Sequence, residues 1–205
     1  MQTDTELAQA CMAWQENRSK GSTPIRAAAR VLTGVPHYFR ADFISAEEEA
    51  ARGNPTTLRH ARSLLHAVAA AEPQDVNQWR LATATSGTGA ASRGLSAKPG
   101  DLDDQIEHAV RNTGVLMMPL WGFSLSESVA RSYGERFLLR LHGRFSAVPA
   151  WEISGVKGHE LELIGGGVYV VRDVSTEAGT TVVDLEQTAT LLPLPGRYEQ
   201  LAARS

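Results

Sequence analysis

Cysteine is almost absent from this sequence, and so are the hydrophobic stretches that a membrane protein needs. Cys11 is the single cysteine of 205 residues, so the chain cannot form an internal disulfide, and thiolate metal clusters are excluded. No stretch approaches the ~20 apolar residues that cross a bilayer as a helix. The first residues, Met1 to Glu6, are polar and acidic and do not resemble a signal peptide. We therefore expect a protein made in a cytoplasm, without a membrane partner.

A strong charge of one sign is also missing. The formal net charge is −3, from 20 basic and 23 acidic residues, so no overall field draws the chain to nucleic acid or to an anionic membrane. We therefore do not expect nucleic acid as a partner. Apolar residues make up 42% of the sequence, which at this length is enough for one domain with a stable core, or for a core with a helical extension.

Two short motifs resemble cofactor or metal sites but fail on their spacing. The glycine-rich segment 87–94 places its third glycine two positions too late for the dinucleotide fingerprint, and no Gly-Lys-Ser/Thr follows as in a phosphate-binding loop. The dipeptide His159-Glu160 begins like a zinc-binding helix motif, but Leu163 stands where the second histidine belongs. We expect a plain loop at the first place and no metal site at the second.

The hydrophobic pattern places helices first and strands later. Apolar residues recur at helical spacing from Leu58 to Val68, and Pro73 ends that helix. Strands are then predicted at 79–85, 115–125, 136–142, 145–152, 158–164, 167–173, 180–185 and 188–193, with short helices at 101–114 and 126–134 and a loop at 86–94. This order indicates an α+β fold rather than alternating βαβ units. We predict a helical region over residues 1–72 that packs on a core formed by residues 73–205.

An acidic pair, Glu160 and Glu162, stands inside the apolar strand pattern from Gly158 to Leu163. In an extended strand these two carboxylates point to the same face, while Leu161 and Leu163 point to the core. Glutamate has a poor strand propensity, and two carboxylates at this spacing repel each other. The pair therefore indicates one of two situations: a cationic substrate faces the strand, or the two acids lie on the solvent-exposed face of an ordinary antiparallel sheet.

Two segments that precede this pair complete a recognisable order. They are Gln78-Trp79-Arg80-Leu81 and Trp121-Gly122-Phe123-Ser124-Leu125-Ser126-Glu127, in which an aromatic-Ser-x-Ser strand runs into a helix. An arginine on a strand, then Ser-x-Ser, then Glu-x-Glu, resembles the mono-ADP-ribosyltransferase family, in its Arg/Ser-x-Ser/Glu-x-Glu class of bacterial toxins and effectors. Two positions depart from the family's pattern. Leu125 replaces the middle residue of Ser-Thr-Ser, and Trp79 stands where a tyrosine or another apolar residue is common.

The resemblance implies an ADP-ribosyltransferase-like core of two packed, mostly antiparallel β-sheets, with NAD as a substrate and no metal. It makes Glu162 the acid that stabilises the ribose cation formed as nicotinamide leaves, and Glu160 the acid that faces the acceptor. Since Glu-x-Glu goes with arginine acceptors in relatives, the implied partner is a target protein with an acceptor arginine. The implied catalytic residues are Glu162, Glu160 and Ser124, and the implied NAD-binding residues are Arg80, Phe123, Ser124, Ser126 and Glu162.

Arg80 and Arg93 are alternatives for the arginine that holds the phosphates of NAD. A guanidinium suits this task because it donates in a planar fork that matches phosphate oxygens. Arg80 follows an apolar helix and a proline-containing turn, as in relatives, and leaves room for a helix before Ser124, so we favour it. Arg93 stands in an Arg-Gly dipeptide that family members also show at this strand.

The two serines also have structural roles to fill. Ser126 is predicted to cap the helix that follows it, with Glu127 in the first turn, where the helix dipole favours an acid. Ser124 lies on the same strand face, and the resemblance predicts that its hydroxyl bonds to a neighbouring glutamate and so fixes that side chain.

Other functions stay open at this point. The chain could cleave NAD without a protein acceptor, modify nucleic acid on the same fold, or serve as a binding module without catalysis, which the departure at Leu125 leaves open. Residues 1–72 would either cover the NAD cleft or dock a target or an immunity protein. A toxin of this kind would be delivered into a target cell or would act in a phage-infected host.

Overall fold

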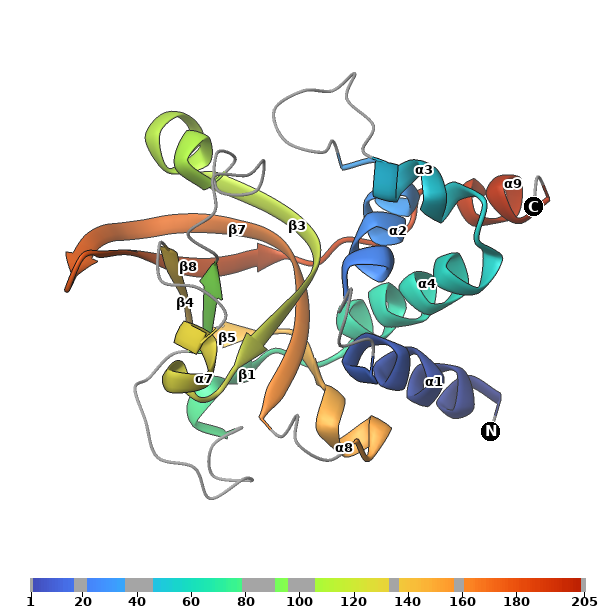
Figure 1. Ribbon diagram of the computed structural model, residues 1–205, viewed down its shortest axis with the longest axis horizontal. Helices are drawn as coiled ribbons and strands as arrows, with labels where there is room; N and C mark the ends of the chain where they lie inside the picture. Colours follow the sequence, from blue (N-terminus) through green and yellow to red (C-terminus); the bar gives the residue numbers. More distant parts are fainter. Residues whose placement is uncertain are drawn as a thin grey trace.

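Helices and strands form two blocks in the computed structural model of this chain, which describes residues 2–16, 22–35, 46–78, 91–95, 106–132, 137–156 and 161–203 (Figure 1). The helices are α1 (Gln2–Glu16), α2 (Thr23–Thr33), α3 (Ala46–Arg52), α4 (Pro55–Ala70), the π-helical segment η1 (Ala109–Thr113), α7 (Glu127–Ser132), α8 (Ala150–Ser154) and α9 (Arg197–Ala202). The strands are β1 (Gln74–Asp75), β2 (Ala91–Leu95), β3 (Val115–Ser124), β4 (Phe137–His142), β5 (Arg144–Phe145), β6 (Ala147–Pro149), β7 (Glu162–Glu177) and β8 (Thr180–Ala189). Helices α1 to α4 and α9 gather beside the sheet.

The ends of α4 follow from local sequence signals. The Asn54 side chain accepts a hydrogen bond from the backbone N–H of Thr57 at 3.0 Å, and Pro55 occupies the first turn, where no N–H is needed. The helix ends at Ala70, shortly before Pro73. Its predicted apolar stripe is confirmed, because the buried residues are Leu58, Ala61, Leu64, Leu65 and Val68.

The main sheet has six strands and curls until it meets itself. Its order is β3-β2-β4-β8-β7-β6, and β3 pairs also with β7, so the strands close a ring. Strands β4 and β8 are parallel, and the other pairs are antiparallel. Strands β1 and β5 form a separate antiparallel pair. The predicted α+β class, with early helices and mostly antiparallel strands, is confirmed.

The long strand β7 joins the two halves of the curled sheet. Its first half pairs with β3 and β6, and its second half pairs with β8. A Cβ added at Gly166 would lie 1.8 Å from the carbonyl oxygen of Pro119, and one at Gly167 would lie 1.9 Å from that of Ala189. Only glycine permits so close an approach of two backbones, so these positions allow β7 to change partners without breaking.

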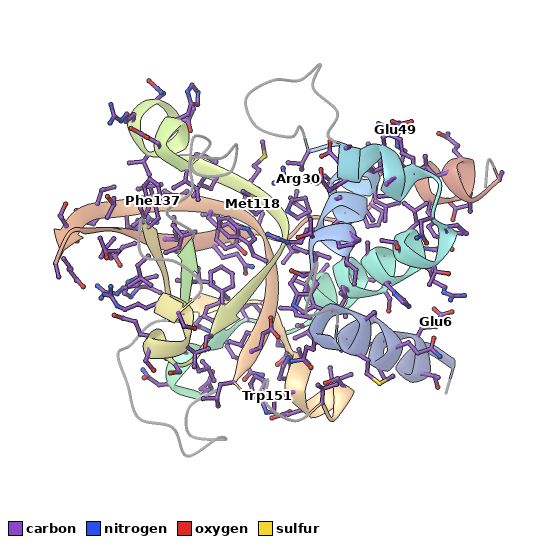
Figure 2. All side chains as sticks on the ribbon, viewed as in Figure 1. Glu6, Arg30, Glu49, Met118, Phe137 and Trp151 are labelled. Atoms are coloured by element: carbon purple, nitrogen blue, oxygen red, sulfur yellow. The ribbon has the colours of Figure 1, made fainter. Side chains whose placement is uncertain are left out.

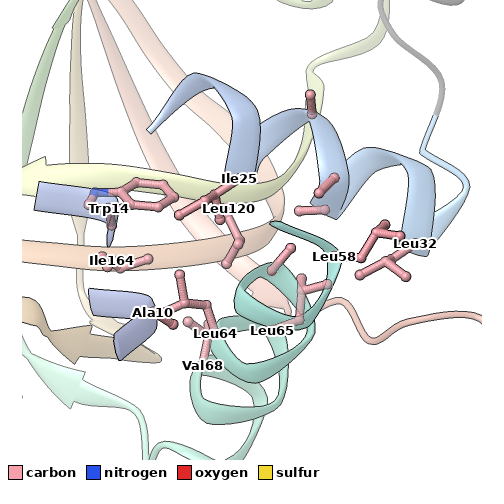
Figure 3. Close-up of a cluster of buried hydrophobic side chains, with 14 of the residues drawn as sticks. Ala10, Trp14, Ile25, Leu32, Leu58, Leu64, Leu65, Val68, Leu120 and Ile164 are labelled. Atoms are coloured by element: carbon pink, nitrogen blue, oxygen red, sulfur yellow. The ribbon is translucent and has the colours of Figure 1, made fainter. Parts of the chain in front are cut away.

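Alternate residues of the same strands face two different cores. Inside the curl, Trp121 and Phe123 pack on Tyr169, with ring centroids about 6 Å apart. On the outer face, Leu120 and Ile164 meet the helices in a second core (Figure 3). The sheet is therefore held from both sides, and residues near the start of β7 can point either inward or toward the helices.

Helix α2 contacts β3 directly. The Arg30 guanidinium donates to the sulfur of Met118 at 3.3 Å, and Figure 2 shows these two side chains between α2 and β3.

None of the helices that the structure describes is long and apolar enough to span a bilayer. Because the helical core contains side chains from the sheet, the boundary near residue 72 stays a prediction.

Several predicted elements differ from the observed ones. Residues 91–94, predicted as loop, lie in β2, where the backbone pairs with β4 in five register positions. The strand predicted at 145–152 stops at Pro149, and α8 begins directly after it. Of the strand predicted at 158–164, residues 158–160 lie outside the described residues, and β7 starts at Glu162, directly after Leu161 with its left-handed φ of 71°. The strand predicted at 79–85 lies outside the described residues.

Candidate functional site

Glu162 and Ser124 lie opposite each other where β3 ends and β7 begins. They are direct partners in the antiparallel register, and directly opposed residues project from the same face of a sheet. The pairing extends one step further, since the N–H of Leu125 donates to the carbonyl of Leu161 at 3.0 Å. The structure thus brings together two of the predicted catalytic residues, on the face that also carries Ile164 and looks toward the helices.

The carboxylate of Glu162 is bound by helix α1. Trp14 Nε1 donates to Oε1 at 2.9 Å, and Gln15 Nε2 donates to Oε2 at 3.1 Å. Both donor side chains are only 3% exposed. The sequence pattern missed these two residues, because a tryptophan and a glutamine on an early helix carry no mark of contact with a distant strand.

Gln15 is itself held by Ser154, the last residue of α8. The Ser154 hydroxyl donates to the amide oxygen of Gln15, while Ser154 Oγ accepts the backbone N–H of Val156 at 3.1 Å. Because the amide oxygen of Gln15 is taken by this hydroxyl, its NH2 group faces Glu162. A chain of hydrogen bonds therefore runs from the backbone after α8 through α1 to the candidate carboxylate.

Cys11 lies one helical turn before these donors and is fully buried. Burial, together with the nearby charge of Glu162, raises the pKa of the Cys11 thiol to about 12, so it stays neutral near physiological pH. The thiol is therefore a packing group and not a nucleophile. Nowhere in the described ranges do three or more His, Cys, Asp or Glu side chains gather as the ligands of a metal ion would.

Ser124 and Ser126 organise the turn from β3 into α7. Ser124 Oγ accepts the N–H of Ser126 at 3.0 Å, and Ser126 Oγ lies 3.5 Å from the N–H of Val129. Ser126 thus occupies the capping position predicted for it, directly before α7. The described hydrogen bonds of the Glu162 carboxylate come from α1 and not from Ser124, which differs from the serine–glutamate bond implied by the resemblance.

An ion-pair network fixes α7 against the sheet behind this turn. Arg140 bonds to Glu127 and to Glu177, with its shortest contact at 2.7 Å, and Arg131 also reaches both acids. Burial raises the pKa of Glu127, but hydrogen bonds from Arg140 and Arg131 outweigh it and lower that pKa overall. The turn that carries Ser124 and Ser126 therefore continues into a helix, α7, that ion pairs hold against the sheet.

Phe123 lies on the face opposite to Ser124. Its ring is 1% exposed and packs between Trp121 and Tyr169 in the inner core. The observed contacts give Phe123 a packing role beneath the strand end, and its predicted contact with NAD stays a prediction.

The remaining predicted residues are placed only in part. Glu160 and Arg80 lie outside the described residues. Arg93 stands on β2 next to Ser92, whose backbone pairs with Ser124, while its side chain is outside the described part. Leu161 has a left-handed φ of 71° directly before β7, and because Glu160 lies outside the described residues, its placement on the same face as Glu162 stays a prediction.

Comparison with known proteins finds the fold and no sequence relative. No protein-family model matches the sequence, and no curated protein matches it. The structure is similar to that of the ADP-ribosyltransferase Vis in complex with the M6 inhibitor, at a TM-score of 0.50 and 12% identity. That match covers 91% of this chain and 76% of Vis, which is a toxin from Vibrio splendidus.

Two further solved structures have lower scores. Exoenzyme S from Pseudomonas aeruginosa, solved with human 14-3-3 protein beta and carba-NAD, gives a TM-score of 0.47 and 16% identity over 90% of this chain and 88% of that chain. The ADP-ribosyltransferase HopU1 of Pseudomonas syringae pv. Tomato DC3000 gives 0.45 and 11%, over 91% and 97% of the two chains. At such identity a likeness reports the fold alone. The helices, the curled sheet and the match to Vis together show that this chain has the ADP-ribosyltransferase fold.

Proposed function

We propose that this protein is an NAD-dependent mono-ADP-ribosyltransferase that transfers ADP-ribose to an arginine of a target protein and releases nicotinamide. The observation that carries the proposal is a half-buried carboxylate, Glu162, directly opposite Ser124 at the end of β3 in a chain with this fold. A toxin or effector role, with delivery into a target cell or action in an infected host, belongs to the same proposal.

Glu162 is the acid proposed to act at the ribose. Cleavage of NAD breaks the bond between ribose C1′ and the nicotinamide nitrogen, and the electron pair leaves with nicotinamide. The ribose then carries positive charge, as in glycoside hydrolysis. A carboxylate beside the ribose stabilises that charge, and a hydrogen bond to the ribose 2′-hydroxyl fixes its geometry. No Lys or Arg of the described ranges forms an ion pair with Glu162, which leaves its charge available.

Glu160 is proposed to face the acceptor. A guanidinium has so high a pKa that a neighbouring carboxylate is needed to orient it and to accept its proton. A guanidinium nitrogen would attack C1′, and the proton displaced would pass to Glu160 and then to solvent. Arg80, with Arg93 as the alternative, is proposed to hold the phosphates of NAD, and Ser124, Ser126 and Phe123 to support the same site.

Substitution of the two acids tests the proposal. Glu162→Gln keeps the side-chain volume but removes the charge, so release of nicotinamide should fall by about two to four orders of magnitude. Glu160→Gln should abolish transfer to agmatine, a small guanidino acceptor, yet leave slow hydrolysis of NAD, because water needs no carboxylate to orient it. Nicotinamide release and ADP-ribosyl-agmatine are measured by chromatography, with and without agmatine.

The matched control is Glu49→Gln, the same change on the exposed surface of α3 (Figure 2). It should leave both reactions unchanged. A Glu162→Gln protein that transfers ADP-ribose at the wild-type rate would overturn the assignment of the acid. NAD hydrolysis with no labelling of any guanidino acceptor would indicate an NAD glycohydrolase. A folded wild-type protein without turnover would indicate a binding module.

A further inference from the structure

We propose that helix α1 is a working part of the active site, in which Trp14 and Gln15 are positioning residues that hold the Glu162 carboxylate in its reactive orientation. The inference rests on the proposed function of Glu162 at the ribose. It assigns a specific task to a helix far from the motif residues in sequence.

The geometry of the two hydrogen bonds fixes the carboxylate plane. One donor reaches each oxygen, Trp14 Nε1 to Oε1 at 2.9 Å and Gln15 Nε2 to Oε2 at 3.1 Å. A carboxylate held at one oxygen still turns about its terminal bond, whereas one held at both does not. Each oxygen offers about two lone-pair sites, and the hydrogen bonds from the described residues take one on each, which leaves the other for a ribose hydroxyl or a developing cation. The two hydrogen bonds therefore orient the Glu162 carboxylate without using all of its capacity to accept hydrogen bonds.

Both donors are rigid. The Trp14 indole is 3% exposed and belongs to the helical core near Leu120 and Ile164 (Figure 3). The Gln15 amide is fixed by the Ser154 hydroxyl on its oxygen. A side chain that is locked by its own packing and by a further hydrogen bond can hold a reacting group within the small tolerance that catalysis needs.

Both donors are also neutral. An arginine or lysine in their place would hold the carboxylate but offset the charge that the ribose cation needs. An indole N–H and an amide N–H supply orientation while the full negative charge stays on Glu162. Cys11, the titratable group of α1 recorded beside this carboxylate, remains a neutral thiol and adds no charge.

The packing of α1 against the rest of the protein does not depend on the hydrogen bonds from Trp14 and Gln15 to Glu162. Apolar side chains of α1, among them Ala10 and Cys11, are already fully buried against the other helices. Trp14→Phe keeps most of the apolar ring and removes the N–H. Gln15→Met keeps the length and removes the amide. Both variants should therefore fold and keep α1 in place, so that a loss of activity reports on the hydrogen bonds alone.

The first test compares kinetic constants for NAD cleavage. A hydrogen bond to a charged group corresponds to about a ten- to hundredfold effect, so Trp14→Phe and Gln15→Met should each lower kcat by that factor and leave the KM for NAD nearly unchanged. Trp151→Phe, the same change on α8, is the matched control and should alter neither (Figure 2).

The second test needs no turnover. With 15N-labelled tryptophan, the Trp14 indole resonance is assigned by its loss in Trp14→Phe. In the protein without NAD, Glu162→Gln should shift this resonance more than the indole resonances of Trp121 and Trp151.

The outcomes separate the two proposals. If the wild type cleaves NAD and Glu162→Gln does not, but both α1 variants keep the wild-type kcat, the positioning role is wrong while the proposed function stands. A Trp14 indole resonance that does not shift in Glu162→Gln would also overturn the positioning role. Failure of the wild type to cleave NAD would overturn the function, and the positioning role with it, even where the indole resonance shows the hydrogen bond.

Discussion

Cys11 offers a residue-scale test of how firmly α1 closes over the candidate site. Its pKa of about 12 leaves almost no thiolate at pH 8, and its side chain is fully buried. We expect native protein to react with iodoacetamide at least about a thousandfold more slowly than an ordinary thiol of pKa ~8.5. Because it is the single cysteine, mass spectrometry follows it without ambiguity.

The control is the same reaction in urea, where Cys11 should react at the rate of a free thiol. Rapid labelling of the native protein would contradict the burial of Cys11 and the packing of α1 against α4 and α8. A variant that loosens α1 without unfolding the chain should react at an intermediate rate.

The residues of the site could be predicted from the sequence only where they break a local pattern. Glu162 is visible because an acid inside an apolar strand is unusual, and Ser126 because a serine before a helical segment is a cap. Trp14 and Gln15 obey every local rule for a helix. Their contact with Glu162 depends on tertiary packing, so the sequence alone gives no sign of it.

At the scale of elements, β7 comes very close to the backbone of β3 at Gly166. A Cβ at Gly166 would fall 1.8 Å from the Pro119 carbonyl oxygen, so Gly166→Ala must push β3 and β7 apart. We expect the free energy of unfolding to fall by about 3 kcal/mol or more, measured by urea denaturation.

Gly165→Ala is the matched control for this change. Its Cβ would meet the Phe123 ring at 3.5 Å, an ordinary contact distance, so stability should change much less. Equal effects of the two substitutions would show that the loss reflects the general cost of replacing glycine in a strand, and not the close approach at Gly166.

The same glycines explain why the sequence predicts two strands where the structure has one. Gly165 to Gly167 look like a turn, since glycine clusters usually end strands. Here they serve a close approach of backbones inside a continuous strand. Leu161 is the opposite case. A bulky residue rarely adopts positive φ, so nothing in the pattern predicts that β7 starts directly after it.

At the scale of the whole molecule, the helices and the sheet share one of the two cores. Leu120, Val148 and Ile164 from the sheet lie in the same cluster as the buried faces of α1, α2 and α4. We therefore expect one cooperative unfolding transition, in which helical circular dichroism and tryptophan fluorescence change together on heating. Two separated transitions would instead support independent units at 1–72 and 73–205.

The global architecture was predictable because it depends on order and composition rather than on single contacts. Helical spacing before Pro73 and strand patterns after it suffice for the α+β class. The closure of the sheet through the pairing of β3 with β7 joins segments distant in sequence, and no local signal encodes such a pairing.

The hydrogen bond between Trp14 and Glu162 joins positions 148 residues apart, and that between Gln15 and Glu162 spans 147. Contacts of such separation close very large loops, which slows their formation relative to local helices and hairpins. A chain made from its N-terminus presents α1 long before β7 exists, so the carboxylate can be held only once most of the chain has been synthesised and folded. An incomplete chain therefore lacks an assembled site, and the order of folding delays activity until the molecule is nearly finished.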